Sequence, residues 1–236
     1  MKFWRNRDAQ TGSGAGKNLT EIVMILDRSG SMSGLEGDTI GGFNSMLDKQ
    51  KKEEGEAYVS VVLFDDRQEV LYDRCPIQKV PPMTDKEYYV RGATALLDAV
   101  GGAIRHIDTI HRYARPEDVP AKTLFIITTD GMENASRHFT GPEVRRMIEQ
   151  HKEADHWEFL FLGANMDAAE TASRIGIDRH HAATFHNDSF GQSLNYEAMS
   201  DAVSRARCAP SAAAMQEDFE DGAVFDEVRR DFARRK

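Results

Sequence analysis

The sequence lacks several features that would place it in a specialised class of proteins. Only two of its 236 residues are cysteines, Cys75 and Cys208, and they lie far apart without CxxC spacing. This excludes a disulfide framework and indicates a reducing compartment. No window approaches the roughly 20 consecutive apolar residues that span a bilayer, which excludes a transmembrane helix. We therefore expect two ordinary thiols in a soluble chain.

Positive charge is also scarce. The 30 Lys and Arg residues face 39 Asp and Glu residues, which gives a formal net charge of −9. No run of like charge is long enough to form a nucleic-acid-binding arm, so we expect no nucleic-acid partner. The chain begins MKFWRNRDAQ, without the apolar segment of a signal peptide. These absences predict a cytoplasmic protein with no membrane partner.

The first residues do not form a phosphate-binding loop, although they are rich in glycine and end in Lys17. The P-loop pattern needs a glycine where Thr11 stands and a serine or threonine where Asn18 stands. The segment also precedes the first predicted strand, whereas a phosphate-binding loop follows one. We therefore expect residues 1–19 to be a flexible leader.

What the sequence does contain is a repeated alternation of strand and helix patterns. Hydrophobic residues make up 40% of the chain and charged residues 29%, which is enough for one sizeable domain with its own core. The alternation predicts a doubly wound, Rossmann-like α/β sandwich of three layers, with a mostly parallel sheet and one antiparallel strand at its edge. Apolar and β-branched runs predict strands at 22–26, 58–64, 69–72, 122–129, 157–162 and 182–185, and helical spacing predicts helices at 38–54, from 94 onward, from 141 onward, and at 167–175 and 189–207.

The composition changes after Pro210, so we treat residues 209–236 as a C-terminal tail. Phe225, Val228 and Phe232 lie at positions i, i+3 and i+7, the spacing of an amphipathic helix. Two interpretations stay open for this helix: it packs on its own domain or frays in solvent, or it binds a partner.

Two predicted strands end in an aspartate, Asp27 and Asp130. If these strands are neighbours, their carboxylates share the crevice in which open α/β sheets bind ligands. Ser29 and Ser31 alternate with Asp27 and so face the same way in an extended loop, and Thr94 can add a third hydroxyl. An all-oxygen set of this kind suits Mg²⁺ or Mn²⁺ and suits Zn²⁺ poorly, because zinc prefers His and Cys ligands.

These residues resemble the metal-ion-dependent adhesion site of von Willebrand factor type A domains. The resemblance rests on DRSGS at 27–31, on Thr94 within GATAL and on Asp130 within TDG, and it covers residues 20–208. It implies that Ser29, Ser31 and Thr94 bind the metal directly, whereas Asp27 and Asp130 act largely through water. It also implies that the metal takes an acidic residue of a protein partner as a further ligand.

The single-domain, cytosolic form also resembles stand-alone bacterial members of that family, including those linked to tellurium-resistance and stress-response clusters. This resemblance implies association with signalling partners such as a protein kinase or phosphatase. The function that we expect is therefore a metal-dependent protein-binding module, and not an enzyme.

A Mg²⁺-dependent enzyme, such as a phosphoester hydrolase, is the alternative. A phosphatase that uses Asp27 as its nucleophile would need a second acid where Ser29 stands. The stretch GSMSG at 30–34 resembles the turn that carries a hydrolase serine, but Met32 occupies the nucleophile position. No residue of the motif is a convincing nucleophile or general base.

Other polar residues carry weaker signals. The eight histidines show no zinc-ligand spacing, and a hairpin turn accounts for the acidic pair Asp65 and Asp66. Glu133 and Asn134 follow Asp130 closely, and the sequence leaves two roles open for them: they cap the loop, or they contact an incoming ligand.

Overall fold

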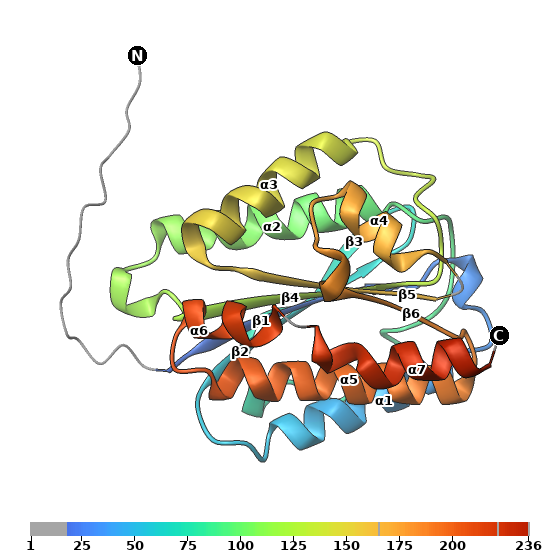
Figure 1. Cartoon of the computed structure of the whole chain (residues 1–236), viewed down its shortest axis with the longest axis horizontal. Helices are drawn as coiled ribbons and strands as arrows, with labels where there is room; N and C mark the ends of the chain where they lie inside the picture. The colour runs from blue at the N-terminus through green and yellow to red at the C-terminus, as the bar shows by residue number, and fades with distance from the viewer. Residues whose placement is uncertain (1–17, 165, 221, 236) are drawn as a thin grey trace.

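The computed structural model describes residues 18–164, 166–220 and 222–235. The predicted leader therefore lies outside the described residues, except for Asn18 and Leu19. A six-stranded sheet forms the middle layer of the molecule, with helices on both faces (Figure 1). The strands are β1 (Thr20–Asp27), β2 (Ala57–Phe64), β3 (Gln68–Pro76), β4 (Lys122–Thr129), β5 (Glu158–Ala164) and β6 (Ala182–Phe185).

The sheet confirms the predicted fold class. Its strand order is β3-β2-β1-β4-β5-β6. Strand β3 is an antiparallel edge strand, whereas every other pairing is parallel. The order reverses between β1 and β4, and at such a reversal the two following loops leave in opposite directions and open a crevice. The two strands that end in the predicted aspartates are therefore neighbours at that crevice.

The helices cover the two faces of the sheet in two groups. Helices α2, α3 and α4 lie on one face, and α1, α5, α6 and α7 lie on the other (Figure 1). Each face has its own apolar core, since alternate residues of the buried strands point to opposite sides. The bounds are α1 (Glu36–Gln50), α2 (Leu96–Tyr113), α3 (Gly141–Asp155), α4 (Ala168–Arg174), α5 (Ser189–Cys208), α6 (Ala212–Phe219) and α7 (Asp226–Arg234).

The segment after Pro210 packs on the rest of the chain. Helix α6, which the sequence did not predict, buries Met215 and Phe219 in the same core as α1 and α5. The amphipathic helix expected around Phe225, Val228 and Phe232 is α7 with the turn before it. Phe225 and Val228 are buried in that same core. None of the described helices is both long and apolar enough to cross a membrane.

Several predicted boundaries were wrong. Helix α1 runs from Glu36 to Gln50, so it begins and ends earlier than the predicted 38–54. Strand β3 has nine residues in place of the predicted four, since an edge strand can pair through its backbone while polar side chains face solvent. Helix α2 begins at Leu96, two residues after Thr94, and β5 is shifted to Glu158–Ala164 from the predicted 157–162.

Adjacent glycines in α1 provide a matched test of how closely α1 packs on α5. A Cβ atom at Gly42 would lie 2.2 Å from a ring carbon of Tyr196, whereas one at Gly41 would meet nothing within 4 Å. We expect Gly42→Ala to lower the free energy of unfolding by about 1–3 kcal/mol through overpacking. Gly41→Ala should raise it by up to about 1 kcal/mol through helix propensity. Urea unfolding measures both, and equal stability of the two variants would contradict this packing.

Candidate metal centre

The predicted site residues lie on three loops at the carboxyl edge of the sheet. Asp27 is the last residue of β1, and Asp130 directly follows β4. Because Leu26 is paired with Thr128 in the parallel register, the ends of these strands lie side by side. Thr94 lies two residues before α2 in the connection that returns to the same edge. The topology thus places all three segments around one crevice.

Four of the five predicted side chains form one continuous chain of hydrogen bonds. The Oγ atoms of Ser29 and Ser31 lie 3.0 Å apart, and Thr94 Oγ1 donates to Ser29 Oγ at 3.1 Å. Ser31 Oγ donates to Asp130 Oδ1 at 2.5 Å. Segments separated by up to 99 residues in sequence therefore bring their oxygen atoms together.

Asp27, the fifth residue, is not part of this series of hydrogen bonds and is held by partners of its own. Its Oδ1 accepts a hydrogen bond of 2.7 Å from the backbone N–H of Ser29. Its Oδ2 accepts one of 2.5 Å from Thr129 Oγ1. Asp27, Ser29 and Thr94 are buried, whereas Asp130 is half-buried and Ser31 is exposed. The oxygen atoms therefore extend from the interior to the surface.

Burial affects the ionisation of both carboxyl groups of the site. Burial raises the pKa of Asp27 to about 6, although hydrogen bonds from Thr129 and Ser29 lower it. Burial also raises the pKa of Asp130, against hydrogen bonds from Ser31 and Asn187. A cation beside these carboxylates would stabilise their ionised forms.

The space between the hydroxyl groups depends on Gly131. A Cβ atom at this position would lie 2.5 Å from Thr94 Oγ1 and 3.2 Å from Ser31 Oγ. Only a residue without a side chain leaves the two hydroxyls accessible to a common ligand. Together with the all-oxygen donor set, this opening fits a hard divalent cation.

Sequence reasoning missed three residues that hold the predicted ones in place. Thr129 donates to Asp27, as described above, and the Tyr88 hydroxyl donates to the Asp27 carbonyl oxygen at 2.6 Å. Asn187 Nδ2 donates to Asp130 Oδ2 at 2.9 Å from the connection between β6 and α5. Thr129 could have been noticed beside Asp130, but no local pattern marks Tyr88 or Asn187.

A second network fixes the loop from the side. Arg28 is fully buried, and its Nε donates to Asp65 Oδ2 at 2.8 Å. Arg91 Nε donates to the same oxygen at 2.8 Å. Burial raises the pKa of Asp65, but these hydrogen bonds and others hold this pKa below its ordinary value. Asp65 does form the predicted hairpin turn, and it also balances the charge of Arg28 next to Asp27.

Glu133 and Asn134 position the backbone around Thr94. The Asn134 Oδ1 atom accepts a hydrogen bond of 2.9 Å from the Thr94 backbone N–H. Glu133 Oε2 accepts one of 2.9 Å from the N–H of Leu97, in the first turn of α2. Of the two roles left open by the sequence, the structure therefore shows capping.

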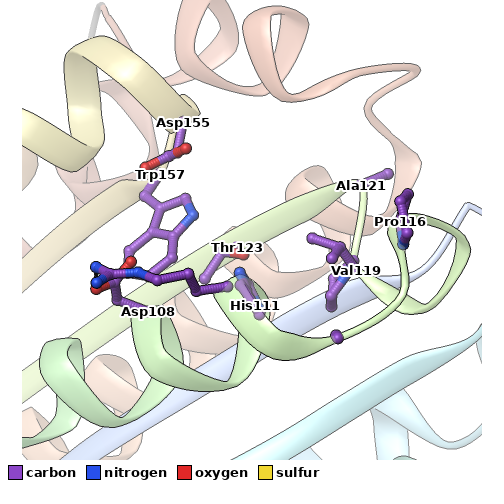
Figure 2. A pocket seen from close by; sticks show the side chains of 11 residues that line it. Asp108, His111, Pro116, Val119, Ala121, Thr123, Asp155 and Trp157 are labelled. Carbon is purple, nitrogen blue, oxygen red and sulfur yellow. Dashed lines mark hydrogen bonds and ion pairs between the residues drawn. The ribbon is translucent and has the colours of Figure 1, made fainter. Parts of the chain in front are cut away.

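No group of three or more His, Cys, Asp or Glu side chains in the described residues is arranged to hold a metal ion. The candidate centre has two carboxylates and three hydroxyl groups, so it does not form a cluster of this type. A cavity of about 580 Å³ lies at the opposite, amino-terminal edge of the sheet, lined by residues that include Asp108, His111 and Trp157 (Figure 2). None of the five predicted residues lines it.

Comparisons with known proteins place the fold. No protein-family model matches the chain, and no curated protein matches it either. Among solved structures, the chain is similar to a von Willebrand factor type A protein from Catenulispora acidiphila. The two are 16% identical with a TM-score of 0.53, over 83% of this chain and 42% of that one.

Two further structures are similar. Proximal thread matrix protein 1 of the mussel byssus, with zinc in its metal-ion-dependent adhesion motif, is 16% identical with a TM-score of 0.54, over 79% of this chain and 46% of that one. The other is the von Willebrand factor domain of the type V pilus tip protein Mfa5 from Porphyromonas gingivalis. It is 12% identical with a TM-score of 0.53, over 80% of this chain and 96% of that one.

The fold of this chain is thus that of von Willebrand factor type A domains. The chain spans less than half the length of the Catenulispora acidiphila and mussel proteins. It spans most of the length of the pilus domain. At these identities the likeness concerns the fold, so the role of the site has to be argued from its own residues.

Proposed function

We propose that this chain is a metal-dependent protein-binding module of the von Willebrand factor type A class. Ser29, Ser31 and Thr94 would hold Mg²⁺ or Mn²⁺ directly, with Asp27 and Asp130 as its outer partners. The observation that supports this most strongly is the continuous chain of oxygen atoms from three separate loops, open to a common ligand at Gly131. The metal would supply an electrophilic centre for a carboxylate of the partner.

The residues themselves explain why binding is favoured over catalysis. Both oxygens of the Asp27 carboxylate accept hydrogen bonds, and the residue is only 2% exposed. It is therefore poorly placed to attack a phosphoester. Ser29 stands where a phosphatase of this kind would carry its general acid.

A protein kinase or phosphatase as partner, and a place in a cytoplasmic stress-response or signalling complex, form the finer part of this proposal. These points rest on the resemblance to stand-alone bacterial members of the family. Affinity purification of the full chain from native lysate, with and without EDTA, would test them. We expect a partner that is released by EDTA, and capture that is insensitive to EDTA would contradict the mechanism.

A substitution that removes one hydroxyl tests the metal itself. Thr94→Val preserves the shape of the side chain, but it should weaken Mn²⁺ binding on the order of 100-fold because a ligand is lost. Thr94→Ser, which retains the hydroxyl, should keep most of the affinity. Isothermal titration with MnCl₂ measures both variants.

Ser33→Ala is the matched control, because it removes a hydroxyl from the same loop outside the proposed set. Its Mn²⁺ affinity should equal that of the unmodified chain. If Thr94→Val also binds Mn²⁺ normally, Thr94 is not a ligand.

A further inference from the structure

The exposed apolar side chains are distributed unevenly over the protein. Among the described residues, five large apolar side chains are exposed, and three of them lie within three residues of a residue that belongs to the candidate metal centre or contacts it, two on loops and one in the first turn of α5. These three are Tyr89, Met132 and Phe190, which are 42%, 73% and 61% exposed. Exposed apolar groups gathered around a binding site indicate an interaction surface.

Each of the three is tied to a different part of the centre. Met132 lies two residues after Asp130. Phe190 lies three residues after Asn187, which donates to Asp130. Tyr89 follows Tyr88, whose hydroxyl donates to the Asp27 carbonyl oxygen. The three apolar residues therefore come from three sequence segments that each carry a residue of the centre or one that contacts it, and we call them the apolar rim.

Arginine side chains, Arg91 and Arg235 among them in ion pairs with aspartates, accompany the apolar rim. The guanidinium of Arg91 lies 5.3 Å from the centre of the Tyr89 ring, and that of Arg235 lies 5.2 Å from the centre of the Phe190 ring. A cleft of about 490 Å³ begins at Ala95, next to Thr94. Its lining includes two exposed arginines, Arg67 and Arg137, and two aspartates, Asp66 and Asp98. The charges around the rim are balanced, so the proposed metal is what would attract an acidic residue, whereas the apolar rim is complementary to apolar side chains beside it.

We infer that the partner presents an acidic residue flanked on both sides by apolar residues, the acid at the metal and its neighbours on the apolar rim. This inference rests on the proposed function and specifies its partner. An acidic residue alone would leave Met132 and Phe190 in water, whereas apolar neighbours would bury them. The apolar contacts would then carry the sequence specificity that a metal–carboxylate bond lacks.

Selection from a peptide library tests the inference. Displayed seven-residue peptides with a fixed central glutamate and random flanks would be selected on the Mg²⁺-loaded full chain and eluted with EDTA. We expect Leu, Ile, Val, Met and Phe to be enriched about threefold or more beside the glutamate, given the free energy of burying even part of an apolar side chain. If EDTA releases peptides whose flanks show no apolar enrichment, this inference is wrong although the proposed function stands.

Substitutions in the apolar rim provide the second measurement. Met132→Ser and Phe190→Ser should each weaken binding of the best selected peptide about tenfold, the effect of a strong interface contact. Their Mn²⁺ affinity should not change. Tyr113→Ser is the matched control, since Tyr113 is 84% exposed at the far end of α2.

The two failures are distinguishable. If no peptide is released by EDTA, the proposed function fails and the inference falls with it. If peptides are released but Met132→Ser and Phe190→Ser bind them as tightly as Tyr113→Ser does, the apolar rim has no role and only the inference fails.

Discussion

Replacing Gly131 with alanine should strongly weaken metal binding without removing a single oxygen ligand. The new Cβ would lie 2.5 Å from Thr94 Oγ1, which is closer than a Cβ atom, which makes no hydrogen bond, approaches an oxygen atom. The contact can be relieved only if Thr94 or the loop moves, and either movement separates the hydroxyls of Thr94 and Ser31. We expect the Mn²⁺ affinity to fall on the order of 100-fold or more, as measured by isothermal titration.

The control for this variant is Gly141→Ala. A Cβ at Gly141, in the first turn of α3, would meet nothing within 4 Å. Thermal unfolding of the metal-free variants should show that both are folded, because Gly131 does not have the positive φ that only glycine adopts readily. Normal Mn²⁺ binding by folded Gly131→Ala would show that the metal does not lie between these hydroxyls.

Replacing Arg207 with alanine should cause the largest loss of stability. Arg207 is buried near the end of α5, and its guanidinium binds the end of α1. Its Nη1 donates to the Gln50 carbonyl oxygen, and its Nη2 donates to the carbonyl oxygens of Glu53, Glu54 and Gly55 at 3.0–3.1 Å. Without it the Gln50 carbonyl group loses its partner in a buried place, and the other three lose theirs in a half-buried one. We expect the free energy of unfolding to fall by about 3 kcal/mol and Tm by roughly 6–12 °C.

Two further variants show whether the geometry of the guanidinium matters. Arg207→Lys keeps the positive charge, but one ammonium group cannot reach the carbonyl groups of both Gln50 and Gly55, so it should recover only part of the stability. Arg174→Ala removes an exposed arginine that pairs with Glu170 on α4, and it should cost less than about 1 kcal/mol. Similar losses for Arg207→Ala and Arg174→Ala in urea unfolding would contradict the role of Arg207.

The same contact explains why the predicted end of α1 was wrong. Sequence periodicity and Gly55 predicted a helix that continues to residue 54. In the structure the helix ends at Gln50, and Arg207 binds the carbonyl groups that follow. No local pattern indicates this, because Arg207 lies more than 150 residues further along the chain.

The fold class was predictable because its determinants are local. The apolar runs of β1, β4 and β5 predict strands buried on both faces, and the helical stripes between them predict parallel crossovers. The candidate site was predictable for a related reason. Asp27 ends one buried strand and Asp130 directly follows another, whereas the extended loop expected for Ser29 and Ser31 was wrong, because Gly30–Met32 forms a 3-10 turn.

The sequence by itself therefore determined which strands form, which oxygen atoms they present and at which edge of the sheet. Only the tertiary structure decided that β1 and β4 are neighbours, that Asn187 and Tyr88 hold the site residues, and that Met132 and Phe190 face solvent beside them. The physical reason is the range of the interactions. Hydrophobic periodicity acts over a few residues, whereas the contacts that complete this site join segments 57 and 61 residues apart, and nothing in either segment alone specifies its partner.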